Sequence, residues 1–174
     1  VPIVSTTGSR LPLHCTGVGK VLLAHAPDDV RERVLAGRKQ RFTPYTVTSR
    51  RALEDQLSRI LADGYATTIE EMTLGACSVA VPITAGPGST DVVAAIGFVV
   101  PDLRRTKTRL VSALQVAAHG IARNLAEPNQ RTLEEERQAI LQRHGPNSSP
   151  AAGPGAPFRV NPEIWLEVNM TPGP

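Results

Sequence analysis

Three segments with strand character follow one another closely in this sequence, and their order restricts the fold more than any other feature. Tyr65–Ile69, Cys77–Thr84 and Val92–Val100 are rich in β-branched and apolar residues, which favour strands. A Gly-Pro-Gly-Ser turn at residues 86–89 joins the last two segments. Because a parallel pair needs a crossover of about a dozen residues or more, short connections indicate antiparallel pairing. We therefore predict an antiparallel meander.

Helical patterns precede these strands. Thr16 can act as the N-cap of a first helix. Within this helix, Val18, Val21, Leu22 and His25 fall at helical spacing and define one face. Pro27 opens a second, short helix that ends at Gly37. Ser49 can cap a third helix, which ends at Gly64 and carries an apolar stripe of Leu53, Leu57, Ile60 and Leu61.

The longest helical pattern follows the strands, at residues 106–126. Its predicted apolar stripe consists of Leu110, Leu114, Ala117, Ala118, Ile121 and Leu125. A further strand is predicted at the start of the chain, in residues 1–7. Because the strands and the helices are segregated along the chain, the predicted fold class is α+β, with helices packed on an antiparallel sheet.

The sequence predicts one domain, followed by a segment of different composition. Residues 1–126 can form a single core. In residues 127–174 we expect a charged helical extension at 132–143, and then an irregular tail in which 11 of the last 30 residues are Pro or Gly.

The composition excludes several classes of protein. No run of about 18 apolar residues is present, and no basic segment followed by an apolar one opens the chain, so we expect a cytoplasmic protein without a membrane segment. Its net charge of +3 is unevenly placed, with +5 in residues 1–126 and −2 in residues 127–174, and this distribution is weak evidence for direct contact with nucleic acid. Cys15 and Cys77 have no partners at metal-ligand spacing, so we expect free thiols, no metal and no cofactor.

Three local patterns suggest chemistry: a glycine-rich segment, a pair of glutamates and the two cysteines. Gly17-Val18-Gly19-Lys20 resembles part of a phosphate loop, but such a loop needs glycine at position 14 and Ser or Thr at position 21. Glu70 and Glu71 are neighbours at a strand end and therefore face different directions, with one toward solvent. A small thiol enzyme that uses Cys15 or Cys77 stays open as an alternative function, although buried, unreactive thiols are the simpler interpretation.

Four separated motifs together resemble one family. They are LPLHCTGVGKVLLA at 11–24, GYATTIEE at 64–71, LGACSVAVPI at 74–83 and VVAAIGFVVPDLR at 92–104, and they resemble the C-terminal effector-binding domain of IclR-type transcriptional regulators. The resemblance implies a curved, GAF-like antiparallel sheet and a homo-dimer or tetramer. It also implies that DNA is contacted only through an N-terminal winged helix-turn-helix that this chain lacks. The function implied is ligand sensing, not catalysis.

The resemblance also implies a set of effector-binding residues. Gly17 and Val18 present backbone amides at the start of a helix, while Ala76 and Ser78 line one face of a strand. In many relatives the position of Thr68 is acidic and those of Gly97 and Val99 are serines. We therefore expect a larger cavity at Gly97 and an apolar wall at Val99. The predicted effector is an aromatic or bulky carboxylate that is less polar than a small keto acid, with Thr68 and Ser78 as hydrogen-bonding side chains. An oligomerisation module with a vestigial pocket is a further alternative.

Overall fold

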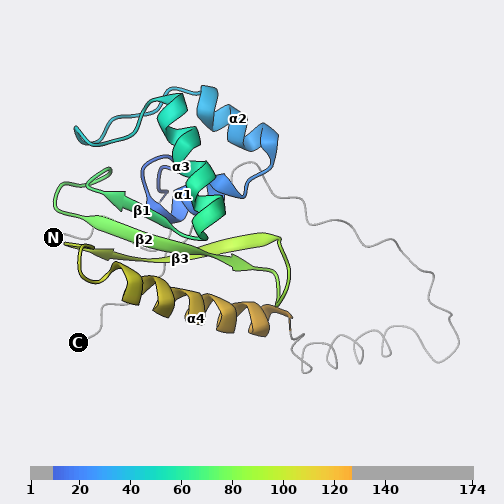
Figure 1. Ribbon diagram of the computed structural model, residues 1–174. Helices are drawn as coiled ribbons and strands as arrows, with labels where there is room; N and C mark the ends of the chain where they lie inside the picture. Colours follow the sequence, from blue (N-terminus) through green and yellow to red (C-terminus); the bar gives the residue numbers. More distant parts are fainter. Residues whose placement is uncertain (1–9, 127–174) are drawn as a thin grey trace, which may run out of the picture.

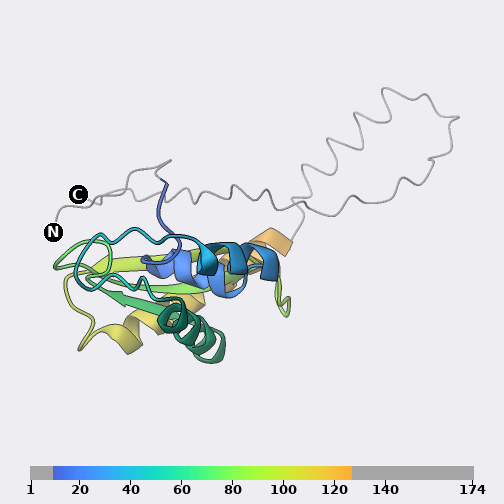
Figure 2. The same ribbon diagram turned by 90° about the horizontal axis from the view of Figure 1, so that it is seen from above.

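The computed structural model describes residues 10–126, which form a sheet with three helices on one face and one helix on the other (Figure 1). The helices α1 (Gly17–Ala24), α2 (Asp28–Ala36) and α3 (Arg50–Asp63) precede the strands β1 (Ala66–Ile69), β2 (Cys77–Thr84) and β3 (Val92–Val100), and α4 (Lys107–Ala126) follows them. The first three helices lie over one face of the sheet, and α4 runs along the other face (Figures 1 and 2). The predicted α+β class is confirmed.

The three strands form an antiparallel meander in the order β1-β2-β3, as the sequence predicts. The register aligns Thr68, Ser78 and Val99 in one row across the sheet. The next row on the same face, two residues along each strand, contains Ala66, Ala80 and Gly97. Because side chains alternate between the faces of a sheet, both rows face the same layer of helices.

The predicted helix boundaries are confirmed by the caps that the sequence suggested. Thr16 Oγ1 accepts a hydrogen bond from the Gly19 amide, and Ser49 Oγ accepts one from Ala52. Gly64 ends α3 in the left-handed conformation with φ of 75°, which favours glycine. These caps satisfy amides and carbonyls that lack partners within the helix itself, and this explains why short local patterns located the helix ends.

Each face of the sheet has its own apolar core. One core joins α1, α2 and α3 to the sheet through small residues such as Ala66 and Ala80. The other core packs α4 against the opposite face, where Val79, Val81 and Ile83 project from β2. Small side chains on the first face allow α1 to approach the backbone of β2 closely, and this approach builds the candidate site described below.

Two predicted helix faces are confirmed only in part. In α1 only Val21 of the four predicted residues is buried, because the helix is enclosed between α3 and the sheet and also buries Gly17, Gly19 and Lys20. In α4 the buried residues are Val111, Leu114, Ala118 and Ala122, of which Leu114 and Ala118 belong to the predicted stripe.

 Leu110 and Ile121 are half-buried at the edges of this stripe, whereas Ala117 and Leu125 are exposed. Leu61, the last member of the predicted apolar stripe of α3, is 54% exposed.

Several predictions concern parts of the chain outside the described residues. The strand in residues 1–7 and the extension and tail in residues 127–174 belong to this group. Within residues 10–126, no helix combines the length and the apolar character needed to cross a bilayer.

Candidate functional site

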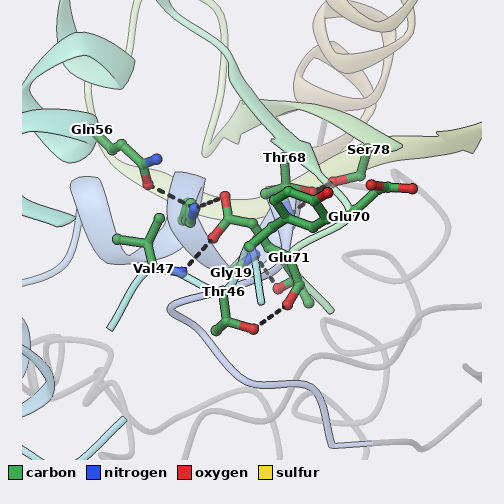
Figure 3. Close-up of polar contacts among 12 residues, drawn as sticks. Gly19, Thr46, Val47, Gln56, Thr68, Glu70, Glu71 and Ser78 are labelled. Atoms are coloured by element: carbon green, nitrogen blue, oxygen red, sulfur yellow. Dashed lines mark hydrogen bonds and ion pairs between the residues drawn. The ribbon is translucent and has the colours of Figure 1, made fainter. Parts of the chain in front are cut away.

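The start of α1 contacts a row of hydroxyl groups on the sheet. The Gly17 amide donates a hydrogen bond of 3.1 Å to Ser78 Oγ, and Ser78 Oγ lies 2.6 Å from Thr68 Oγ1. Thr68 is 5% exposed and Ser78 is half-buried. Figure 3 shows Thr68 and Ser78 side by side. Three of the residues implied by the resemblance, Gly17, Thr68 and Ser78, are thus brought together by direct hydrogen bonds.

Most of the amides in the first turn of α1 already have acceptors. Thr16 Oγ1 accepts a hydrogen bond from the Gly19 amide, and the Thr16 carbonyl accepts one from the Lys20 amide. Ser78 Oγ accepts the hydrogen bond of the Gly17 amide. The amide of Val18 is the remaining one, and no acceptor for it occurs among the described residues. Because free amides and the helix dipole give a helix start a partial positive charge, this position favours an anion.

Glycine at position 17 is required by the close approach of α1 to β2. A Cβ atom at Gly17 would lie 2.7 Å from Ser78 Oγ and 3.4 Å from the Cβ of Ala80. The hydrogen bond between the Gly17 amide and Ser78 depends on this short separation. A side chain at position 17 would therefore push the helix start away from the hydroxyl row.

The other predicted site residues lie near this row, with different degrees of contact. Ala76 is half-buried and precedes β2, and its carbonyl accepts a hydrogen bond of 2.8 Å from the Glu70 amide. Val99 is in register with Ser78 and is 52% exposed. The half-buried side chain of Val18 packs against the core around α1.

The expectation that Gly97 enlarges a cavity is wrong. A Cβ atom at Gly97 would lie 2.6 Å from the Val79 carbonyl oxygen and 3.0 Å from the Cβ of Ala80. The space that a side chain would need is therefore occupied by β2 itself. The physical reason for glycine here is the close approach of the two strands.

A buried ion pair lies next to this site, and the sequence interpretation missed it. Lys20 Nζ contacts Glu71 Oε1 and donates a hydrogen bond of 2.7 Å to Gln56 Oε1. Lys20 is 1% exposed and Glu71 is 4% exposed. The sequence did contain a signal, since Lys20 stands among the apolar residues of a short helix that the fold encloses. Its partner, 51 residues away, could not be identified without the fold.

Glu71 also holds the loop before α3. Its Oε2 accepts a hydrogen bond of 3.4 Å from the Val47 amide, and its backbone carbonyl accepts one of 2.6 Å from Thr46 Oγ1 (Figure 3). The neighbouring Glu70 is directed elsewhere, with its Oε1 accepting from the Gly75 amide at an exposed position. The two carboxylates therefore have separate partners, as their adjacent positions predicted.

The charges at the pair affect nearby titratable groups. Burial lowers the pKa of Lys20, and the charge of Glu71 and its hydrogen bond oppose this change. Burial also lowers the pKa of His14, whose Nε2 lies 2.9 Å from the Gln40 carbonyl oxygen. At neutral pH the lowered pKa favours the uncharged form of His14.

Both cysteines are buried free thiols, in agreement with the sequence analysis. Burial, assisted by the negative charge of Glu71, raises the pKa of Cys15 to about 11. Burial also raises the pKa of Cys77. Because the thiolate is the nucleophilic form, these shifts disfavour the thiol chemistry of the alternative function. Among residues 10–126, no group of three or more His, Cys, Asp or Glu side chains is arranged to hold a metal ion.

Comparison with known proteins gives a consistent set of relatives. Residues 1–127 match the family model described as the C-terminal domain of the bacterial transcriptional regulator IclR. The chain is 41% identical over 120 residues to the HTH-type transcriptional regulator BhcR of Paracoccus denitrificans, covering 68% of this chain and 42% of that protein. The chain thus spans less than half the length of this relative.

Two solved structures extend the comparison to ligand complexes. An IclR homologue from Microbacterium hydrocarbonoxydans, complexed with 4-hydroxybenzoate, is 35% identical with a TM-score of 0.66, over 74% of this chain and 52% of that one. The inducer-binding domain of the PobR transcription factor from Acinetobacter, a double mutant in complex with 3-hydroxybenzoic acid, is 28% identical with a TM-score of 0.58. This match covers 67% of this chain and 70% of that one.

Proposed function

The chain belongs to the IclR family of bacterial transcriptional regulators, and its residues 1–127 correspond to the C-terminal domain of that family. We propose that this domain senses a small carboxylate at the start of α1. The main support for this proposal is the chain of hydrogen bonds that links the Gly17 amide to Ser78 Oγ and Ser78 Oγ to Thr68 Oγ1. Hydroxyl groups and helix-start amides are suitable donors to a carboxylate. Under this proposal the domain is a sensor and not an enzyme.

The proposed effector is an aromatic or bulky carboxylate. Apolar side chains at Ala76 and Val99 flank the hydroxyl row and can contact an aromatic ring, while Gly97 keeps the strands close. The benzoate-type ligands of the two solved relatives support the same class. The carboxylate would accept hydrogen bonds from the Val18 amide and from the hydroxyls of Thr68 and Ser78. In the described structure these two hydroxyls form a hydrogen bond with each other.

We also propose that effector binding regulates the whole protein. An effector that binds one arrangement of the domain more tightly shifts the population toward it. A coupling free energy of about 1–3 kcal/mol changes the DNA affinity of an attached winged helix-turn-helix roughly 5- to 150-fold. We propose that such a domain reads the DNA in the cytoplasm, and that the regulator acts as a homo-dimer or tetramer.

Isothermal titration calorimetry with 4-hydroxybenzoate and pyruvate tests the proposed effector class. We expect 4-hydroxybenzoate to bind more tightly. The Thr68→Val variant keeps the shape of the side chain but removes its hydroxyl, and should weaken 4-hydroxybenzoate binding by about tenfold to 100-fold, because a hydrogen bond to a charged group contributes about 1.5–3 kcal/mol.

The matched control is Thr108→Val, which makes the same change at an exposed position on α4. This variant should bind 4-hydroxybenzoate as the wild type does. Tighter binding of pyruvate would contradict the proposed effector class. Equal affinities of the Thr68→Val variant and the wild type would contradict the proposed site.

A further inference from the structure

The buried ion pair is built on the same two elements as the proposed effector site. Lys20 follows Gly17 by three residues on α1, and Glu71 follows Thr68 by three residues after β1. Since an α-helix rises about 1.5 Å per residue, the backbone of Lys20 is about 4.5 Å farther along the axis than that of Gly17. A carboxylate at the start of α1 would therefore bind close to two buried charges.

These charges are poorly screened by solvent. Lys20 and Glu71 are almost completely buried, and Gln56 supplies a further neutral acceptor to the ammonium group. Charge interactions inside a protein are stronger than in water because the effective dielectric constant is lower, at about 20. Both members of the pair can therefore act on groups several ångströms away.

The charges of Lys20 and Glu71 both affect the pKa values of the residues just before α1. The negative charge of Glu71 raises the pKa of Cys15, after the larger effect of burial, while the positive charge of Lys20 lowers it. At His14 the same two charges again act in opposite directions, after the larger effects of burial and of the hydrogen bond to Gln40. Glu71 thus offsets, at the start of α1, the positive potential that Lys20 alone would create.

We propose that Glu71 is a specificity-determining residue of the effector site, because its neutralisation of Lys20 limits the preference for anionic over neutral ligands. This inference rests on the proposed function and deepens it. With Glu71 in place, the attraction for a carboxylate comes mainly from the amides of α1 and the hydroxyl row. Without the charge of Glu71, the Lys20 ammonium adds its own attraction. Because Glu71 opposes the lowering of the Lys20 pKa by burial, the affinities are compared at mildly acidic pH, where the ammonium form of Lys20 and the carboxylate form of the ligand are both favoured.

The expected size of the effect follows from the charge interaction. Two unit charges about 10 Å apart interact by about 1.1–1.7 kcal/mol when the effective dielectric constant is between about 20 and 30. Glu71→Gln should therefore raise the ratio of anion affinity to neutral-ligand affinity by about sixfold to 17-fold. A purely structural role of Glu71 would change both affinities by the same factor and leave their ratio constant.

The test is calorimetry on the full chain with 4-hydroxybenzoate and its uncharged amide, 4-hydroxybenzamide. The matched control is Glu70→Gln, which removes a carboxylate from the adjacent residue whose partner is the Gly75 amide at an exposed position. We expect the affinity ratio to rise in Glu71→Gln and to equal the wild-type ratio in Glu70→Gln. An unchanged or reduced ratio in Glu71→Gln, or an equal rise in both variants, overturns the inference.

A second variant, with an effect of opposite sign, keeps the test decisive if Glu71→Gln does not fold. Lys20→Met leaves the charge of Glu71 without its counter-charge, so the ratio of anion affinity to neutral-ligand affinity should fall by at least about threefold. A smaller fall, an unchanged ratio or a raised ratio in Lys20→Met would overturn the inference. A wild type that binds neither compound overturns the proposed function together with the inference, whereas normal binding with an unmoved ratio overturns the inference alone.

Discussion

Replacing Lys20 with methionine is expected to lower the free energy of unfolding by about 3–5 kcal/mol, because the carboxylate of Glu71 would remain buried without its partner. Glu71 is 4% exposed, so water cannot replace the lost ammonium group. Gln56 would also lose its contact with Lys20 Nζ. Urea unfolding followed by circular dichroism measures the change.

The double variant Lys20→Met with Glu71→Leu is the control for this prediction. Replacing both members of a buried ion pair by apolar residues of similar volume is often neutral or stabilising. We expect this variant to recover most of the stability that Lys20→Met loses. A loss of less than about 1 kcal/mol in Lys20→Met would be typical of an exposed ion pair and would contradict the buried pair described above.

Replacing Gly19 with alanine should destabilise the domain by about 3 kcal/mol, at the upper end of the usual cost of overpacking. A Cβ atom at Gly19 would lie 2.5 Å from Thr16 Oγ1, 2.7 Å from the Leu13 Cα and 2.8 Å from the Leu13 carbonyl oxygen. Two of these three atoms belong to the backbone and cannot rotate away. The cap that Thr16 provides to the Gly19 amide would also be disturbed.

Gly120→Ala is the matched control, with the opposite expected sign. Gly120 lies within α4, and a Cβ atom there would meet nothing within 4 Å. Because alanine favours helices more than glycine does, this variant should stabilise the domain by about 0.5–1 kcal/mol. Thermal unfolding of both variants distinguishes the two environments. Equal effects of the two substitutions would contradict the packing described for the start of α1.

The features of the fold that the sequence predicted well are local ones. Thr16, Ser49 and Gly64 mark helix ends through contacts within a few residues, and such contacts are readable without the tertiary structure. The three strands and their antiparallel order follow from short connections in the same way. The buried faces of α1 and α4 were predicted less well, because they depend on which layers enclose each helix.

The candidate site shows the same division. The resemblance brought Gly17, Thr68 and Ser78 into one hypothesis, and the structure places them in hydrogen-bond contact. The role of Gly97 could not be predicted, since it depends on the distance between two strands. The pairing of Lys20 with Glu71 likewise joins residues far apart in the sequence, and no local pattern specifies such a partner.

A titration of the full chain with 4-hydroxybenzoate, followed by NMR of the backbone amides, tests most directly whether the start of α1 binds the effector. The proposed site predicts that the amide resonances of Gly17 and Val18 shift most, together with that of Ser78 on β2. Saturable shifts centred on the exposed side of α4 around His119, with the amides of Gly17 and Val18 unmoved, would contradict it.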